Sequence, residues 1–280
     1  MAALTMAAAS MGAAPTTGAR ATTTRAASAP MNEPLPCPSP GGSKPTVVLV
    51  HGAWADTSSW SGEVDALRRA GYVARAIANP LQGLGTDAAA VADFLRTLPG
   101  PIVLVGHSYG GSVITNAAAG VPQVKALVYV DAAAPDVGEA TGKLSGTNSA
   151  LNANPDTLYD KVAQPGAPRG VAGLYLKRDT FVGSFATDLP RETALRLWAI
   201  QRAASTSAFT TPSAAAAWKS IPSWYFVSTG DRIITPASKL AMARRAHAKI
   251  TRFEGGSHLT LISHPDAVTS VIGSAICSAR

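Results

Sequence analysis

The chain has 280 residues, of which 46% are hydrophobic and only 15% are charged. This length allows one large domain with an insertion and a sizeable core. No apolar run reaches about 18 residues, so the sequence predicts no membrane span. The net charge is +7, but basic pairs such as Arg68-Arg69 and Arg244-Arg245 fall on predicted amphipathic helices. We therefore expect solvated basic faces and no nucleic-acid partner.

Residues 1–44 are rich in Ala, Thr, Ser and Pro and hold few large apolar side chains. Such a segment cannot bury enough surface to fold, so we expect a disordered leader and linker. Ala27-Ser28-Ala29 resembles a signal-peptidase site, although Pro30 follows it unfavourably. We expect a secreted or extracytoplasmic protein, and a cytoplasmic protein with a disordered leader is the alternative.

From residue 45 the sequence alternates predicted strands with predicted helices. The strands cover 46–50, 72–77, 101–106 and 124–131, and the helices cover 64–70 and 86–98. The second helix has its apolar residues at i, i+3, i+4 and i+7 from Val91. This alternation predicts a parallel sheet with right-handed crossovers in an α/β core.

The alternation stops after Asp131. Residues 134–217 contain predicted helices at 155–163 and 191–204 and a possible hairpin around 174–185. We interpret this segment as a lid insertion. The alternation then resumes with strands at 223–228 and 250–253 and helices at 236–248 and from Pro265. The predicted core is thus formed by residues 45–133 and 218–280.

The most informative stretch is Gly106-His107-Ser108-Tyr109-Gly110, which follows an apolar strand and precedes a helix. This is the G-x-S-x-G pattern in its strand–turn–helix context. Its glycines allow a tight turn that exposes the Ser108 hydroxyl above the sheet. Ser108 is the predicted nucleophile, and it requires a general base and an oxyanion hole.

Among five histidines, His258 is the predicted base, because its glycine-rich loop follows a strand and such loops form ligand sites in parallel sheets. His264 is the second candidate. The orienting acid should lie between nucleophile and base along the chain. Asp231 and Asp131 both do so, and each lies at the end of a predicted strand. Asp231 is preferred because the strand that it ends is followed directly by the strand that leads to His258.

The backbone amides of Ala53 and Tyr109 are the predicted oxyanion hole, from the first loop and from the residue after the nucleophile. Two cysteines, Cys37 and Cys277, flank the whole predicted core, and in an oxidising compartment we expect them to form a disulfide bond. No cysteine or histidine pair has zinc spacing, so no metal and no cofactor are expected.

These motifs resemble the α/β-hydrolase superfamily from about residue 45 to the end. His51-Gly52-Ala53-Trp54, the elbow around Ser108 and Gly256-Ser257-His258 are similar to the small hydrolases grouped with plant methyl esterases and hydroxynitrile lyases, bacterial relatives included. The resemblance implies a mostly parallel sheet flanked by helices, with a lid inserted after the sixth-strand position.

The function expected is hydrolysis of a small-molecule carboxylic ester through Ser108, His258 and Asp231. A lactone of the acyl-homoserine type is an alternative substrate. A lyase is disfavoured, because lyases of this resemblance carry Thr at Gly52 and Lys at Leu259. A receptor-like binding protein is a further alternative. The sequence does not indicate an oligomeric state. Four apolar side chains are candidate substrate contacts: Trp54, Leu174, Phe181 and Trp198.

Overall fold

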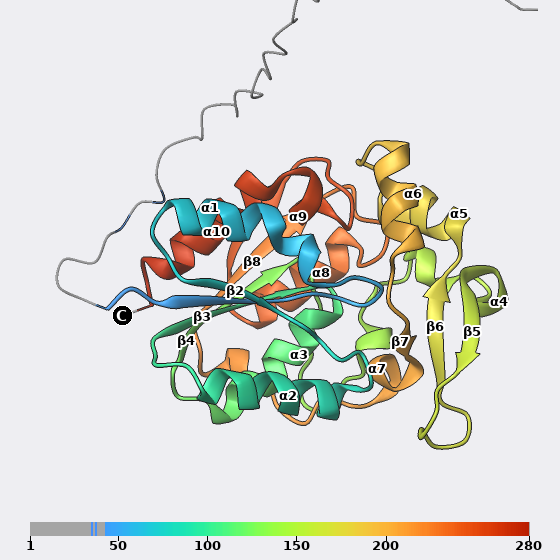
Figure 1. Cartoon of the computed structure of the whole chain (residues 1–280), viewed down its shortest axis with the longest axis horizontal. Helices are drawn as coiled ribbons and strands as arrows, with labels where there is room; N and C mark the ends of the chain where they lie inside the picture. Colours follow the sequence, from blue (N-terminus) through green and yellow to red (C-terminus); the bar gives the residue numbers. More distant parts are fainter. Residues whose placement is uncertain (1–34, 36, 38–42, 280) are drawn as a thin grey trace, which may run out of the picture. The chain divides into compact units, whose positions relative to one another are not determined.

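The computed structural model describes residues 35, 37 and 43–279 (Figure 1). Its central sheet has six strands, all parallel, in the order β2-β1-β3-β4-β8-β9. The strands are β1 (Thr46–Val50), β2 (Ala74–Ile77), β3 (Ile102–His107), β4 (Val124–Val130), β8 (Ser223–Ser228) and β9 (Lys249–Phe253). The expected α/β fold with a mostly parallel sheet is confirmed.

The central strands are continuous apolar runs because helices cover both faces of the sheet. Every residue of β3 and β8 is buried, whereas the edge strands β2 and β9 are more exposed. Parallel sheets that are buried on both faces require such runs rather than an alternating pattern. The most hydrophobic predicted strands are therefore the ones at the centre of the sheet.

Helices α1 and α10 lie on one face of the sheet, and α2 and α3 lie on the other (Figure 1). Helix α8 packs against β8 and β9. Pro236 and Pro265 stand at the first turns of α8 and α10, where a missing N–H costs no hydrogen bond. The helices of the core are α1 (Ser61–Arg69), α2 (Leu84–Arg96), α3 (Tyr109–Ala117), α8 (Pro236–Arg245), α9 (Thr260–Ser263) and α10 (Pro265–Ile276).

The segment 134–217 forms its own small layer beside the carboxyl ends of the central strands (Figure 1). It contains a three-stranded antiparallel sheet in the order β5-β6-β7. Its elements are α4 (Pro155–Leu158), β5 (Tyr159–Ala163), β6 (Ala172–Leu176), α5 (Arg178–Thr180), a π-helical turn (Phe181–Phe185), α6 (Arg191–Ala199), β7 (Ala204–Ser205) and α7 (Thr206–Thr210).

Three details of this segment differ from the prediction. The helix predicted over 155–163 ends at Leu158, because Asn154 caps only one turn and the chain then pairs with β6. The hairpin is therefore β5 and β6, and residues 178–185, which we assigned to a hairpin, are helical. The helix predicted over 191–204 ends at Ala199. Strand pairing within the segment overrides the local helical pattern.

The segment 134–217 follows β4, the strand that comes directly after β3 and the turn at Ser108. No helix in the described part of the chain is long and apolar enough to cross a membrane. The predicted export signal lies outside the described residues.

The predicted disulfide bond is not present: Cys37 and Cys277 are both described, and no bond joins them. Both cysteines nevertheless lie near enough to Tyr72 to influence its hydroxyl. The Tyr72 hydroxyl donates to the Cys37 carbonyl oxygen at 3.1 Å. Burial raises the pKa of Tyr72, and both thiols add to this effect. The exposed position of Cys37, with a left-handed φ of 103°, leaves its thiol outside the core.

We predict that Gly111→Ala destabilises the fold. A Cβ at Gly111 would lie 2.3 Å from the carbonyl oxygen of Ala133, which is backbone and cannot move aside without shifting the segment after β4 away from α3. The expected loss is about 3 kcal/mol in the free energy of unfolding, measured by urea denaturation.

The matched control is Gly85→Ala in α2, where an added Cβ would meet no atom within 4 Å. Alanine is the better helix former, so this variant should gain about 0.5–1 kcal/mol. Equal unfolding midpoints for the two variants would contradict the close approach of α3 to the segment after β4.

Candidate active site

Ser108 lies in the turn between β3 and α3, with φ 54° and ψ −124°. A positive φ is uncommon for a residue with a side chain and requires the surrounding structure to hold it. That support comes from hydrogen bonds to the Ser108 carbonyl oxygen, donated by the backbone N–H of Gly111 at 3.0 Å and of Ala133 at 3.1 Å. The turn therefore fixes the Ser108 side chain at the carboxyl edge of the sheet.

The Ser108 hydroxyl is hydrogen-bonded to a buried histidine, and that histidine is in turn hydrogen-bonded to a buried aspartate. Ser108 Oγ is 2.8 Å from His258 Nε2, and His258 Nδ1 is 2.9 Å from Asp231 Oδ2. A carboxylate only accepts, so Nδ1–H donates to Asp231, and Nε2 is left to accept the Ser108 proton. Burial opposes ionisation of Asp231, but His258 and Lys239 outweigh it and hold the pKa of Asp231 well below its usual value.

The structure separates the two candidate acids. Asp231 contacts His258, whereas the Asp131 carboxylate accepts hydrogen bonds from Ser228 and Lys239. The second candidate base, His264, stacks on Phe253 with ring centroids 4.8 Å apart, at the start of α10. Neither His264 nor Asp131 is bonded to Ser108.

The loop that carries His258 is held from several sides. His107 Nε2–H donates to the His258 carbonyl oxygen at 2.8 Å, and burial strongly lowers the pKa of the His107 ring. The Phe185 ring packs edge-on against the His258 ring at 4.8 Å. Asp188, from the insertion, accepts the N–H of Ser257 at 2.9 Å. These contacts restrict the His258 ring to the orientation that faces Ser108.

The loop after β1 passes directly beside the nucleophile. A Cβ on Gly52 would lie only 2.6 Å from the Cβ of Ser108, so only glycine fits there. Ala53 follows at once, and its amide is one of the two predicted oxyanion donors. The other, Tyr109, is the first residue of α3, where the N–H has no acceptor within the helix. Tyr109 thus adjoins Ser108 along the chain, and the loop of Gly52 and Ala53 passes close to Ser108 in space.

His51, at the start of this loop, is buried and holds it in place. Its Nδ1–H donates to the Gly52 carbonyl oxygen at 2.8 Å, and its Nε2 accepts the backbone N–H of Asn79 at 3.0 Å. Arg202 from the insertion donates to the Asn79 carbonyl oxygen at 2.9 Å. Burial lowers the pKa of His51 to about 4, and Arg202 contributes to this shift.

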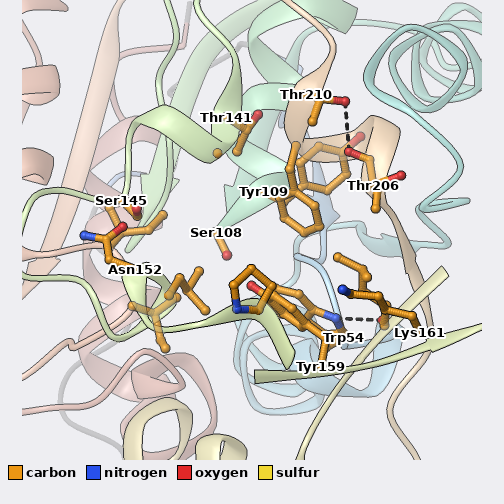
Figure 2. Close-up of a pocket in the computed structure, with 17 residues that line it drawn as sticks. Trp54, Ser108, Tyr109, Thr141, Ser145, Asn152, Tyr159, Lys161, Thr206 and Thr210 are labelled. Carbon is orange, nitrogen blue, oxygen red and sulfur yellow. Dashed lines mark hydrogen bonds between the residues drawn. The ribbon is translucent and has the colours of Figure 1, made fainter. Parts of the chain in front are cut away.

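A cavity of about 290 Å³ opens in front of the Ser108 hydroxyl (Figure 2). Trp54, with a left-handed φ of 58°, forms one wall and stacks between Tyr159 at 5.8 Å and Phe209 at 5.3 Å. The Trp54 Nε1–H donates to the Leu174 carbonyl oxygen at 2.9 Å, which ties the core loop to β6. Most of the other lining residues come from the insertion or follow β8: Thr141, Gly142, Ser145, Leu151, Asn152, Pro155, Lys161, Thr206, Thr210, Ile233 and Ile234.

Of the four predicted substrate contacts, Trp54 and Leu174 line this cavity. Phe181 lines a separate, smaller pocket, and the Trp198 Nε1–H donates to the Leu176 carbonyl oxygen instead. The prediction missed Tyr159 and Phe209, whose rings enclose Trp54. Nothing in the sequence singles these two out, because the tertiary packing of β5 and α7 brings them to the cavity.

In the described part of the chain, no group of three or more His, Cys, Asp or Glu side chains is arranged to hold a metal ion.

The sheet, the elbow and the hydrogen-bonded serine define the class of this protein. The model of the alpha/beta hydrolase family matches residues 47–271, and the chain belongs to that family.

Three similar proteins illustrate its range. Alpha/beta hydrolase nvfD of Aspergillus novofumigatus is 29% identical over 255 residues, which is 83% of this chain and 96% of that protein. The carbendazim hydrolyzing esterase of a Nocardioides species is 35% identical over 108 residues, 33% of this chain and 44% of that protein. The crystal structure of an extracellular alpha/beta-hydrolase from a Paenibacillus species matches with a TM-score of 0.68 at 21% identity, and covers 82% of this chain and 98% of that one.

We predict that His51 makes the fold acid-sensitive. The folded protein keeps His51 neutral down to about pH 4, whereas the unfolded chain protonates it below about pH 6.5. The unfolded state therefore binds more protons in this window, and stability falls as the pH falls through it. Between pH 6.5 and pH 5 the contribution of His51 should be a loss of about 2 kcal/mol.

The measurement compares free energies of unfolding at pH 7 and pH 5. His51→Asn should reduce the acid loss by about 2 kcal/mol, even though it lowers stability at both pH values. His247→Asn, at an exposed position after α8, is the control and should keep the wild-type difference. If the free energy of unfolding of His51→Asn falls between pH 7 and pH 5 by as much as that of the wild type, His51 is not the source of the acid sensitivity.

Proposed function

We propose that the protein is a serine hydrolase that cleaves carboxylic esters of small molecules. The observation that carries the proposal is the hydrogen-bonded series from Ser108 Oγ to His258 Nε2 and from His258 Nδ1 to Asp231 Oδ2, at 2.8 and 2.9 Å, on the floor of an apolar cavity. The esterase name of a curated relative supports the same class of reaction.

In the proposed reaction, His258 Nε2 takes the Ser108 proton while Ser108 Oγ attacks the ester carbonyl carbon. The carbonyl oxygen becomes an oxyanion that the Ala53 and Tyr109 amides stabilise. The C–O bond to the alcohol then breaks, and the leaving oxygen takes the proton from His258. Water repeats the sequence with the same base and releases the acid. Asp231 holds the tautomer of His258 and stabilises its charged form.

We also propose that residues 134–217 act as a lid over a core of residues 45–133 and 218–280. The contacts of Leu174, Asp188 and Arg202 with the core loops support this division. The lid supplies most of the cavity wall, so it would select the substrate.

Two other activities are alternatives: cyanohydrin cleavage by a hydroxynitrile lyase and hydrolysis of a lactone. A hydroxynitrile lyase of this resemblance has Thr at the position of Gly52, and here a Cβ would collide with Ser108 at 2.6 Å. Hydrolysis of lactones uses the same attack on a carbonyl, so only the shape of the cavity separates it from ester hydrolysis.

Export remains a proposal that rests on the composition of residues 1–44. If the protein is exported to an oxidising compartment, we expect Cys37 and Cys277 to pair there, because both thiols act on the pKa of Tyr72. Mass spectrometry of unreduced secreted protein tests this, and alkylation of both thiols would contradict it.

We predict that Ser108→Ala lowers ester turnover by about 10⁵- to 10⁶-fold, because the residues of such a set act as a unit. A fluorophosphonate probe should label the wild-type protein at Ser108. Ser112→Ala is the control, since this buried serine lies one turn later in α3 and accepts a hydrogen bond from Thr141. Turnover of Ser108→Ala within tenfold of wild type would refute the nucleophile. Labelling without turnover on any ester would instead favour a receptor-like binding protein.

We predict that the cavity limits the length of the acyl chain. Among p-nitrophenyl esters, kcat/KM should be highest for short acyl groups and fall for long ones. Leu174→Ala removes a cavity wall and should move the optimum to longer chains. Leu176→Ala, a buried leucine of the same strand that does not line the cavity, should leave the optimum unchanged. Faster cleavage of acyl-homoserine lactones than of any ester would assign the protein to lactone hydrolysis.

A further inference from the structure

A fully buried lysine lies behind the proposed catalytic residues. Lys239 belongs to the first turns of α8, and its side chain is 0% exposed. A buried ammonium is costly unless its charge is compensated and its protons are bonded. The start of a helix also carries partial positive charge, which disfavours a cation further. Its burial in this place therefore requires specific partners.

Lys239 has three such partners, one for each ammonium proton. Its Nζ donates to Asp231 Oδ2 at 2.7 Å, to the Ser228 carbonyl oxygen at 3.1 Å, and to Asp131 Oδ1. Burial lowers the pKa of Lys239, but Asp131 and Asp231 more than reverse this and raise it above its ordinary value. Lys239 is therefore a fixed cation shared by two carboxylates.

The contact with Asp231 falls on the oxygen that matters for the base. Asp231 Oδ2 accepts from both Lys239 Nζ and His258 Nδ1, at 2.7 and 2.9 Å. The other oxygen, Oδ1, accepts the backbone N–H groups of Ile233 at 2.7 Å and Ile234 at 3.2 Å. With four donors in place, the carboxylate of Asp231 cannot rotate away from His258.

The same contact has an electrostatic consequence. A cation on Oδ2 weakens the ability of Asp231 to stabilise a positive charge on His258. Asp131 offsets it, because this second buried carboxylate bonds to Lys239 and is itself held by Ser228 N–H at 2.7 Å and Ser228 Oγ–H at 2.6 Å. Burial raises the pKa of Asp131, and Lys239 opposes that rise.

The remaining ionisable groups around this cluster are His107, whose ring is 4.8 Å from that of His258, Tyr225, and Asp188, which accepts the N–H of Ser257. Burial lowers the pKa of His107 and raises that of Tyr225, so both are neutral near pH 7. The fully buried charges of this cluster are thus Asp131, Asp231 and Lys239, which together sum to one negative charge, whereas Asp188 lies outside it at a partly exposed position.

We propose that Lys239 is a positioning residue that fixes Asp231 Oδ2 toward His258, and that Asp131 offsets its charge, so that the pair sets the pH at which His258 is protonated. The proposal rests on the proposed function for its effect on turnover, but not for its effect on His258. Lys239 touches neither the cavity nor Ser108. Its influence on the reaction passes through Asp231.

The experiment compares Lys239→Met, Asp131→Asn and the double variant. Two readings are taken from each: the pH midpoint of the His258 ring signal in NMR, and the acid limb of kcat/KM on an ester. Lys239→Met leaves uncompensated carboxylates, so both midpoints should rise by about 1 pH unit. Asp131→Asn leaves the cation less compensated, so both should fall. The double variant should lie between them, and Lys239→Met should lower kcat with little change in KM.

Tyr129→Phe is the matched control, because it also deletes a buried hydrogen bond, between Tyr129 and Thr115 at 2.8 Å, without changing a charge. It should lower the free energy of unfolding and leave both midpoints at their wild-type values. If Lys239→Met does not fold, Lys239→Gln retains two donors without the charge and should shift the midpoints in the same direction.

Equal midpoints in the folded variants and the wild type would overturn the proposal and reduce Lys239 to a structural role. Shifts of the same sign for Lys239→Met and Asp131→Asn would overturn the offset by Asp131. If the wild-type protein cleaves no ester, the proposed function fails, yet the NMR midpoints still decide whether Lys239 and Asp131 act on His258.

Discussion

The whole site depends on how closely the turn after β3 approaches the neighbouring backbone. A Cβ on Gly106 would lie 2.6 Å from the Gly110 carbonyl oxygen, and one on Gly110 would lie 2.5 Å from that of Val50. With side chains there, α3 could not lie against β1 and β3. The left-handed Ser108 would then lose the hydrogen bonds that hold it, and its hydroxyl would leave the edge of the sheet. The absence of side chains at Gly106 and Gly110 thus permits the strained position of Ser108, the proposed nucleophile.

The groups that meet this hydroxyl come from three different strand ends, and buried hydrogen bonds hold each of them. His258 is oriented by Asp231, whereas His107, Phe185 and the Asp188–Ser257 contact restrict its ring and loop. Polar groups that are fixed before the substrate binds can stabilise the charge of a transition state without reorganising. This preorganisation is the main source of electrostatic catalysis in enzymes. The same burial makes the site costly to build, since each charge requires a partner. The shared ammonium of Lys239 meets that requirement for two carboxylates at once.

The insertion and the core depend on each other at the cavity. Trp54 belongs to the core, but its indole is stacked between two aromatic rings of the insertion and bonded to the Leu174 carbonyl oxygen. Arg202 and Asp188 reach from the insertion to the loops that hold Gly52 and His258. Movement of the insertion would therefore disturb both the cavity wall and the loops around Ser108. In the proposed mechanism, the selection of substrate by the cavity and the geometry of His258 are therefore physically linked.

The sequence alone predicts the parallel sheet and the elbow at Ser108 and favours His258 over His264, because apolar strand runs, glycine turns and loop position are local properties of the chain. It left Asp231 and Asp131 open, since both end a strand with the same local pattern, and only packing shows which carboxylate meets His258. The hairpin of β5 and β6, the rings around Trp54 and the burial of Lys239 were decided by tertiary structure alone. A lysine in an amphipathic helix normally faces water, and only the convergence of two strand ends on α8 supplies the negative charge that keeps this one buried.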